Sequence, residues 1–144
     1  MTHELRDTDA PRDATLDRLL ERIRYDGAYP TRERAEEVLF GVLTALGRQV
    51  TGEERVDFAG ALPRSAAQAF TAEAPVVEQL GGAAFVYDLA QRTAGSPATA
   101  RWDAGVCLSG IAGLVGDDLV TQLVARLPSG YALLFGRAQL AQAA

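Results

Sequence analysis

The chain contains no lysine and no asparagine, and it has only one cysteine and one histidine. Without lysine, it can form neither a Schiff base nor a lysine-dependent phosphate-binding loop. Cys107 alone cannot form an intramolecular disulfide or a cysteine-based zinc site. His3 lies in a polar N-terminal segment, where it is poorly placed to serve a nucleophile as a base. We therefore expect no bound cofactor, no metal and no catalytic residue.

Long hydrophobic runs and excess positive charge are also missing. The longest uncharged apolar stretch, residues 104–116, is too short to cross a bilayer. The net charge is −5 over 144 residues, so we expect no nucleic-acid partner and no membrane partner. The start of the chain lacks the pattern of a signal peptide, which favours a cytoplasmic location. The arginine-only basic set is typical of codon bias in a GC-rich bacterial genome.

Apolar residues recur at helical spacing along most of the chain, and no segment alternates like a β-strand. The spacing predicts an all-α fold. The expected helices span roughly residues 14–26, 31–47, 51–61, 63–70, 85–90, 97–114, 116–127 and 128–135. Residues 1–12 lack this spacing and predict a flexible N-terminal tail. Residues 72–82 are expected to form a connector, and residues 138–144 a C-terminal tail.

Local signals mark several helix ends. Thr31 and Ser96 are suited to N-capping, and Pro97 to a first helical turn. Thr51 and Glu54 have the spacing of a capping box. The apolar stripes predict a core whose members include Leu43, Leu46, Phe70, Leu108, Ile111 and Phe135.

The two halves of the chain match each other at an offset of 65 residues. Without gaps, this offset places Leu43 on Leu108 and Phe70 on Phe135. The match predicts two pseudo-equivalent repeats, residues 13–71 and 83–137. Each repeat would contain about four helices, and both would pack into one helical bundle.

Each half closes with a Leu-Pro step and an apolar run ending in phenylalanine, from Leu62-Pro63 to Phe70 and from Leu127-Pro128 to Phe135. This pattern resembles the bacterial domain-of-unknown-function family numbered 2267, over about residues 14–137. The resemblance implies tandem helical repeats, and it implies no activity or catalytic residue. The first half departs from the pattern at Ser65 and Ala66, where the second half has Gly130 and Tyr131.

Asp103 is the residue that fits its helix least well, because the repeat places it at the position of Val38, beside the core stripe. A carboxylate there needs a partner or a raised pKa. One interpretation is a rim position or an arginine partner. The other is a polar group in a pocket, together with Arg101 and Trp102. Cys107, one turn further along, is interpreted as a small buried side chain.

Residues 39–47 and 104–116 contain no charged side chain. Helices without a polar face are normally buried, so these two are expected to be central and in contact. The repeat pairs Phe40 with Gly105 and Gly41 with Val106. One hypothesis is that each large side chain fills the space beside the opposite glycine. The alternative is that Phe40 packs elsewhere.

Charge is unevenly distributed, since residues 73–144 hold 4 arginines and 6 acidic residues of the 14 and 19 in the chain. A weakly charged half favours an apolar surface for a protein partner or a second copy. The chain is therefore interpreted as a non-enzymatic interaction or scaffold protein. Two alternatives are a helical protein that binds a small apolar ligand and an enzyme with a polar pocket near Asp103.

Overall fold

The computed structural model describes the backbone of residues 2–137 and the side chains of residues 14–137. This part of the chain forms helices and contains no strand, so the predicted all-α fold is confirmed. The expected C-terminal tail, residues 138–144, lies outside the described residues. The helices are α1 (Thr2–Gly27), α2 (Arg32–Gly47), α3 (Gly52–Gly60), α4 (Arg64–Phe70), α5 (Gly82–Arg92), α6 (Pro97–Val115), α7 (Asp117–Arg126) and α8 (Tyr131–Leu134).

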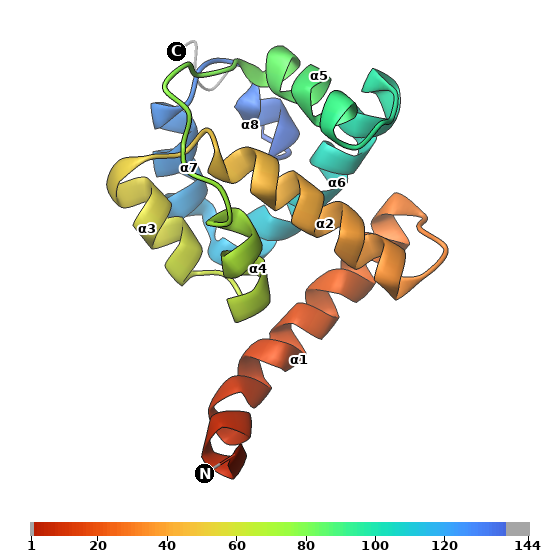
Figure 1. Ribbon diagram of the computed structural model, residues 1–144, viewed down its shortest axis with the longest axis vertical. Coiled ribbons are helices and arrows are strands. Elements are labelled where there is room, and N and C mark those ends of the chain that lie inside the picture. The colour runs from red at the N-terminus through yellow and green to blue at the C-terminus, as the bar shows by residue number, and fades with distance from the viewer. Residues whose placement is uncertain (1, 138–144) are drawn as a thin grey trace.

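Helices α2 and α6 form the centre of the fold and contact each other, as their uncharged stretches predict (Figure 1). Helix α2 also contacts α1, α4 and α5, while α6 also contacts α1, α5, α7 and α8. Helix α3 packs against α7. Because these contacts cross between residues 13–71 and 83–137, the two halves share one core. Their pseudo-equivalence stays a prediction.

The predicted core positions are confirmed. Leu43, Leu46, Phe70, Leu108 and Ile111 are completely buried, and Phe135 is nearly so. The whole predicted stripe of α2 is also buried. The core is thus built by the helical stripes that the sequence displays.

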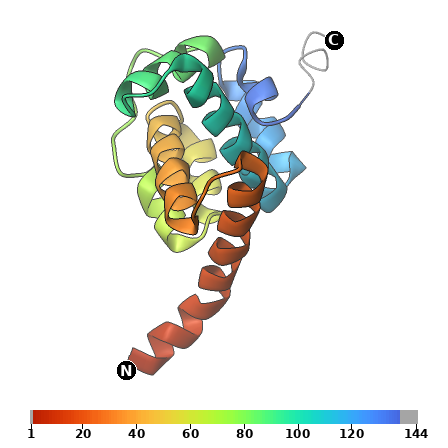
Figure 2. The ribbon, with the colours of Figure 1, turned by 90° about the vertical axis from the view of Figure 1, so that its right-hand side faces the viewer.

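Helix α1 differs from the expectation, because it begins at Thr2 rather than near residue 14. Its N-terminal part extends away from the other helices (Figure 2). Apolar spacing reveals only helices that pack against a core. A helical segment that extends beyond the core has no apolar face, so the sequence pattern could not reveal it.

Two of the expected caps are present, and one is absent. Thr31 Oγ1 accepts a hydrogen bond from the Arg34 amide at 3.1 Å, and Ser96 Oγ accepts one from the Thr99 amide at 3.1 Å. The predicted capping box at Thr51 is wrong, because no side chain in the described part of the chain caps α3. Gly52, the first residue of α3, has a φ of +72°, so the regular cap geometry is lost.

The last helix begins three residues later than expected, at Tyr131 instead of Pro128. Gly130 adopts a left-handed backbone with a φ of +102°. This conformation turns the chain sharply after Pro128, and the helix begins only beyond it. Gly130, which stands where the first half has Ser65, therefore determines where α8 begins.

Helices α2 and α4 approach each other so closely that only glycine fits at position 47. A Cβ atom on Gly47 would lie 1.7 Å from the carbonyl oxygen of Phe70. Beside it, Thr44 Oγ1 donates a hydrogen bond to the carbonyl oxygen of Ala69 at 3.1 Å. Helix α4 is therefore held against α2 through its backbone.

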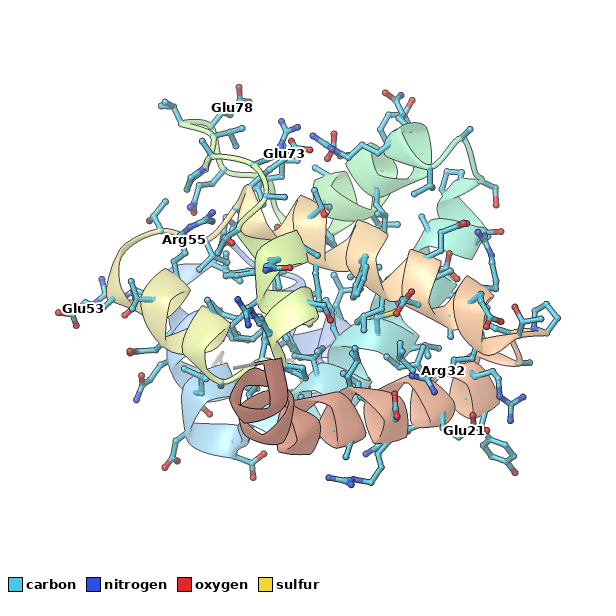
Figure 3. All side chains as sticks on the ribbon, turned by 60° about the horizontal axis from the view of Figure 1, so that its bottom comes forward. Glu21, Arg32, Glu53, Arg55, Glu73 and Glu78 are labelled. Carbon is cyan, nitrogen blue, oxygen red and sulfur yellow. The ribbon has the colours of Figure 1, made fainter. Side chains whose placement is uncertain are left out.

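Arg55 joins α3 to the end of α2 and to the connector (Figure 3). Its guanidinium donates to the carbonyl oxygens of Gly47, Val50 and Glu73. It also lies over the ring of Phe70, with Cζ 5.4 Å from the ring centroid. A cation at the C-terminal end of a helix is favourable, because the helix dipole is negative there.

The connector between the halves is tied down at Leu80. The Leu80 amide donates to Gln49 Oε1 at 2.8 Å, and Tyr131 Oη donates to the Leu80 carbonyl oxygen at 2.9 Å. Nearby, a Cβ atom on Gly82 would lie 2.6 Å from the carbonyl carbon of Gly130. Gly130 and Tyr131 therefore have a structural role that Ser65 and Ala66 do not have in the first half.

The hypothesis that paired Phe40 with Gly105 and Val106 with Gly41 is wrong. A Cβ atom on Gly105 would meet no heavy atom within 4 Å, and one on Gly41 would meet Thr93, at 3.9 Å. Phe40 and Val106 are instead partly buried against the core. Helices α2 and α6 touch along other faces, so these glycines do not accommodate large side chains.

Gly47→Ala should lower the free energy of unfolding by about 1–3 kcal/mol or more, because the added methyl group overlaps the Phe70 carbonyl. The matched control is Gly105→Ala, which adds the same methyl group to a helix where space is open. It should raise stability by up to about 1 kcal/mol through helix propensity. Urea denaturation measures both, and equal effects would contradict the packing described.

Leu43→Ala should cost about 2–5 kcal/mol, because it leaves a cavity in the centre of the core. Leu133 is 53% exposed, so Leu133→Ala should change stability by about 0.5 kcal/mol or less. The same denaturation measurement tests this pair. A small effect of Leu43→Ala would show that α2 is not central.

Candidate functional site

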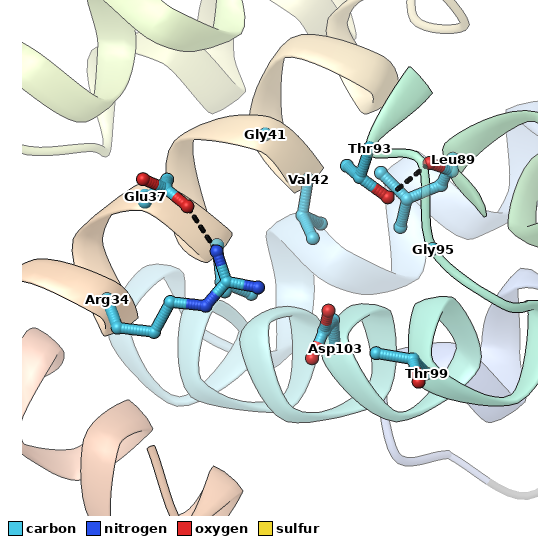
Figure 4. Close-up of a pocket in the computed structure, with 10 residues that line it drawn as sticks. Arg34, Glu37, Gly41, Val42, Leu89, Thr93, Gly95, Thr99 and Asp103 are labelled. Atoms are coloured by element: carbon cyan, nitrogen blue, oxygen red, sulfur yellow. Dashed lines mark hydrogen bonds and ion pairs between the residues drawn. The ribbon is translucent and has the colours of Figure 1, made fainter. Parts of the chain in front are cut away.

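A pocket of about 320 Å³ lies between α2, the end of α5, the loop that follows it and α6 (Figure 4). Its walls come from both halves of the chain. It is lined by Arg34, Glu37, Val38, Gly41, Val42, Leu89, Thr93, Gly95, Thr99 and Asp103. Polar and apolar groups therefore face the same space.

Asp103 supplies a half-buried carboxylate to this pocket from α6. Its Oδ1 atom accepts a hydrogen bond of 2.5 Å from the hydroxyl of Tyr29. Its Oδ2 atom has no hydrogen-bond partner among the residues that the structure describes. One oxygen is thus fixed by the protein, and the other can accept a hydrogen bond from a ligand.

The turn between α1 and α2 positions the Tyr29 side chain next to Asp103. Ala28 has a φ of +57°, and the ring of Tyr29 folds back so closely that a Cβ atom on Gly27 would lie 2.2 Å from it. Trp102 Nε1 donates a hydrogen bond of 3.1 Å to the Gly27 carbonyl oxygen. Two successive residues of α6 therefore hold this turn in place.

The other polar groups of the pocket already have partners. The Arg34 guanidinium donates to the Glu37 carboxylate on the next turn of α2 (Figure 4). Thr93 Oγ1 donates to the Leu89 carbonyl oxygen at 2.9 Å, and Thr99 Oγ1 accepts from Ser96 Oγ at 3.0 Å. Asp103 Oδ2 differs from these groups, because no described residue forms a hydrogen bond with it.

Burial raises the pKa of two groups next to the site. The pKa of Tyr29 is raised by burial and then by its hydrogen bond to Asp103. Burial also raises the pKa of the Cys107 thiol, one turn beyond Asp103 on α6, and the charge of Asp103 adds to this effect. Both groups are protonated at neutral pH. A protonated, buried thiol is a weak nucleophile, which agrees with the interpretation of Cys107 as a core side chain.

The residues expected around Asp103 are only partly brought together. Asp103 lines a pocket, and its partner is a tyrosine hydroxyl, whereas one interpretation expected either a rim position or an arginine partner. Trp102 is 54% exposed and binds the neighbouring turn, and Arg101 is exposed outside the lining. Adjacent helical residues point about 100° apart, so three consecutive residues cannot face one pocket.

The sequence analysis did not assign Tyr29, Arg34 or Glu37 to this site, and all three come before Val38 in the chain. The repeat offset held a usable signal, because it pairs Asp103 with Val38. Both residues line the pocket, from opposite helices. Polar residues near Val38 were therefore candidates for the same site.

Comparison with known proteins identifies the family. The family model described as "Uncharacterized conserved protein (DUF2267)" matches residues 16–134. The chain belongs to the DUF2267 family. The match includes every residue that lines the pocket. None of the curated proteins compared with this DUF2267 chain matches it. Within the described residues, no helix is both long and apolar enough to span a membrane.

Tyr29→Phe should lower the free energy of unfolding by about 1–2 kcal/mol near pH 8, because Asp103 loses a hydrogen bond. The raised pKa of Tyr29 stabilises the fold fully below the ordinary tyrosine pKa of about 10. This contribution is lost as the pH rises above that value, because the unfolded state ionises first. The variant should therefore lose less stability than the wild type between about pH 8 and pH 10.5.

Urea denaturation at the two pH values tests this prediction, with Tyr25→Phe as the control. Tyr25 is 78% exposed, so its variant should behave like the wild type. An identical alkaline loss in the wild type and in Tyr29→Phe would show that neither burial nor the hydrogen bond to Asp103 raises the pKa of Tyr29.

Proposed function

We propose that this DUF2267 protein is a non-enzymatic interaction protein of the bacterial cytoplasm. Its protein partner inserts a basic side chain into the pocket between α2, α5 and α6. The observation that carries the proposal is the carboxylate of Asp103, which presents one free oxygen to a pocket with apolar walls. The proposed partner site thus includes both halves, whereas the sequence pointed to the second half alone.

The pocket suits the two parts of a basic side chain. Val38, Val42 and Leu89 form apolar walls, along which the methylene groups of arginine or lysine can pack. The charged end can then donate to Asp103 Oδ2 in a charge-assisted hydrogen bond. Because Tyr29 already fixes the carboxylate, little side-chain entropy is lost on binding.

The electrostatics also favour a cation. The lining holds one arginine, Arg34, and two carboxylates, Glu37 and Asp103, so its formal charge is negative. The whole chain carries a net charge of −5. A negative pocket on a negative protein attracts basic partners from a distance.

The alternative functions have less support. A volume of about 320 Å³ is at the small end of ligand pockets, and a charged lining suits an apolar ligand poorly. An enzyme would need an activated nucleophile or base. Here both threonine hydroxyls have hydrogen-bond partners, and the neighbouring thiol is buried and protonated. A single buried cysteine without a disulfide partner suits a reducing compartment.

The test is an NMR titration of the ¹⁵N-labelled protein with N-acetyl-arginine methylamide, which presents the side chain without free termini. The shifts should concentrate at α2, the end of α5 and the first half of α6. Asp103→Asn keeps an acceptor for Tyr29 and removes the charge. It should weaken binding about 10-fold or more, because a charge-assisted hydrogen bond is lost.

Asp57→Asn is the matched control, since it removes the same charge at an exposed position on α3. It should leave the affinity within about 2-fold of the wild-type value, because surface charges contribute little. Absence of saturable binding, or equal binding by Asp103→Asn and the wild type, would overturn the proposal. Equal binding of free agmatine would assign the site to small amines instead of protein side chains.

A further inference from the structure

Within residues 14–137, Gln49 is the one polar or charged residue that is buried, with 2% of its surface exposed. Its Oε1 atom accepts from the Leu80 amide at 2.8 Å, and its backbone oxygen accepts from Gln79 Nε2 at 2.9 Å. The Leu80 contact fixes which end of the amide is the acceptor. The Nε2 group, with two hydrogens to donate, has no partner in the described part of the chain. A buried donor without an acceptor is costly.

Gln49 lines a second pocket, of about 360 Å³, on the side of the molecule where α3 meets α7. Glu54, Arg126 and Leu127 also line it. The pocket therefore combines the α2–α3 loop, the start of α3, the connector and the end of α7. None of these residues lines the pocket that contains Asp103.

The polar lining of this second pocket contains several donor groups beside the carboxylate of Glu54. Helix α3 has nine residues, and its first turn receives no cap from a described side chain. Its amide groups and the positive end of its dipole therefore remain available. Arg126 belongs to the lining, and its Nε atom is 3.9 Å from Glu54 Oε2. Gln49 Nε2 adds a donor that is independent of the helix end.

We propose that this second pocket binds a small carboxylic acid with a short apolar tail. The carboxylate would accept hydrogen bonds from Gln49 Nε2 and the first-turn amides of α3, with Arg126 supplying the opposite charge. Leu127, which is partly exposed, supplies apolar surface for the tail, and the buried Val50 and Leu123 lie behind it. Glu54 opposes binding, because it competes for Arg126 and repels the ligand.

The experiment is an NMR titration of the full chain with isovalerate as the probe and isovaleramide as its neutral counterpart. Isovalerate should shift the side-chain amide of Gln49 and the backbone amides of Glu53 and Glu54. Isovaleramide should bind at least about 5-fold more weakly, because it carries no charge.

Three variants give effects of opposite sign. Arg126→Gln should weaken isovalerate binding about 3- to 10-fold, whereas Glu54→Gln should strengthen it by a similar factor. Gln49→Glu keeps the acceptor for Leu80 and replaces the donor, so it should abolish binding. The Arg126 side chain is 75% exposed and the contact with Glu54 is long, so the first two variants test the site even if the third fails to fold.

The proposal is supported if the two charge variants move the affinity in these opposite directions. It is overturned if isovalerate does not bind, if isovaleramide binds equally well, or if the shifts map elsewhere. It is also overturned if both charge variants leave the affinity unchanged. These outcomes do not involve Asp103, so they are distinct from the test of the basic side-chain site.

Discussion

The burial of α2 against α6 is the interaction on which the other parts of the structure depend. Residues 39–47 of α2 and 104–115 of α6 have no charged side chain, so these segments present little charge to water on any face. The structure covers α2 with α1, α4 and α5, and it covers α6 with α1, α5, α7 and α8. The surrounding helices thus cover most of both segments, while Phe40 and Gly105 are only partly buried and Gly113 is exposed.

The pocket around Asp103 lies beside the contact between α2 and α6, where the uncharged part of each helix ends and charged residues begin. Arg34 and Glu37 precede the uncharged part of α2, and Asp103 directly precedes that of α6. Where the helices become polar, side chains no longer close the space between them, and the turn at Tyr29 satisfies one carboxylate oxygen. The same constraint that builds the core therefore leaves a polar recess at its edge.

Helical spacing was sufficient to predict the helices, most of their ends and the core, because burial of one face imposes a repeat on the sequence. Leu43, Leu108 and Phe70 are at predicted core positions for this reason. The N-terminal half of α1 shows no apolar spacing in the sequence, so its helix could not be predicted. Two backbone conformations could not be predicted either. The positive φ of Gly52 accompanies the missing cap of α3, and the positive φ of Gly130 makes α8 begin later than expected.

The site was harder to predict than the fold. Asp103 was detectable because a carboxylate beside a core stripe is unusual, but its partner Tyr29 is 74 residues away in sequence. The proposed contact of Phe40 with Gly105 is absent. The offset between the repeats predicts which positions are equivalent, but it does not predict which faces of two helices contact each other. Gln49 has no motif at all, and only its burial distinguishes it.

Native-state hydrogen exchange is the most direct test of the central role of α2 and α6. The account predicts that the slowest amides lie in both helices, at residues 42–46 and 107–111. They should share one opening free energy equal to that of global unfolding, because the two halves have one core. Slow exchange in α2 combined with exchange in α6 that is faster by several orders of magnitude would contradict it, since the halves would then unfold independently.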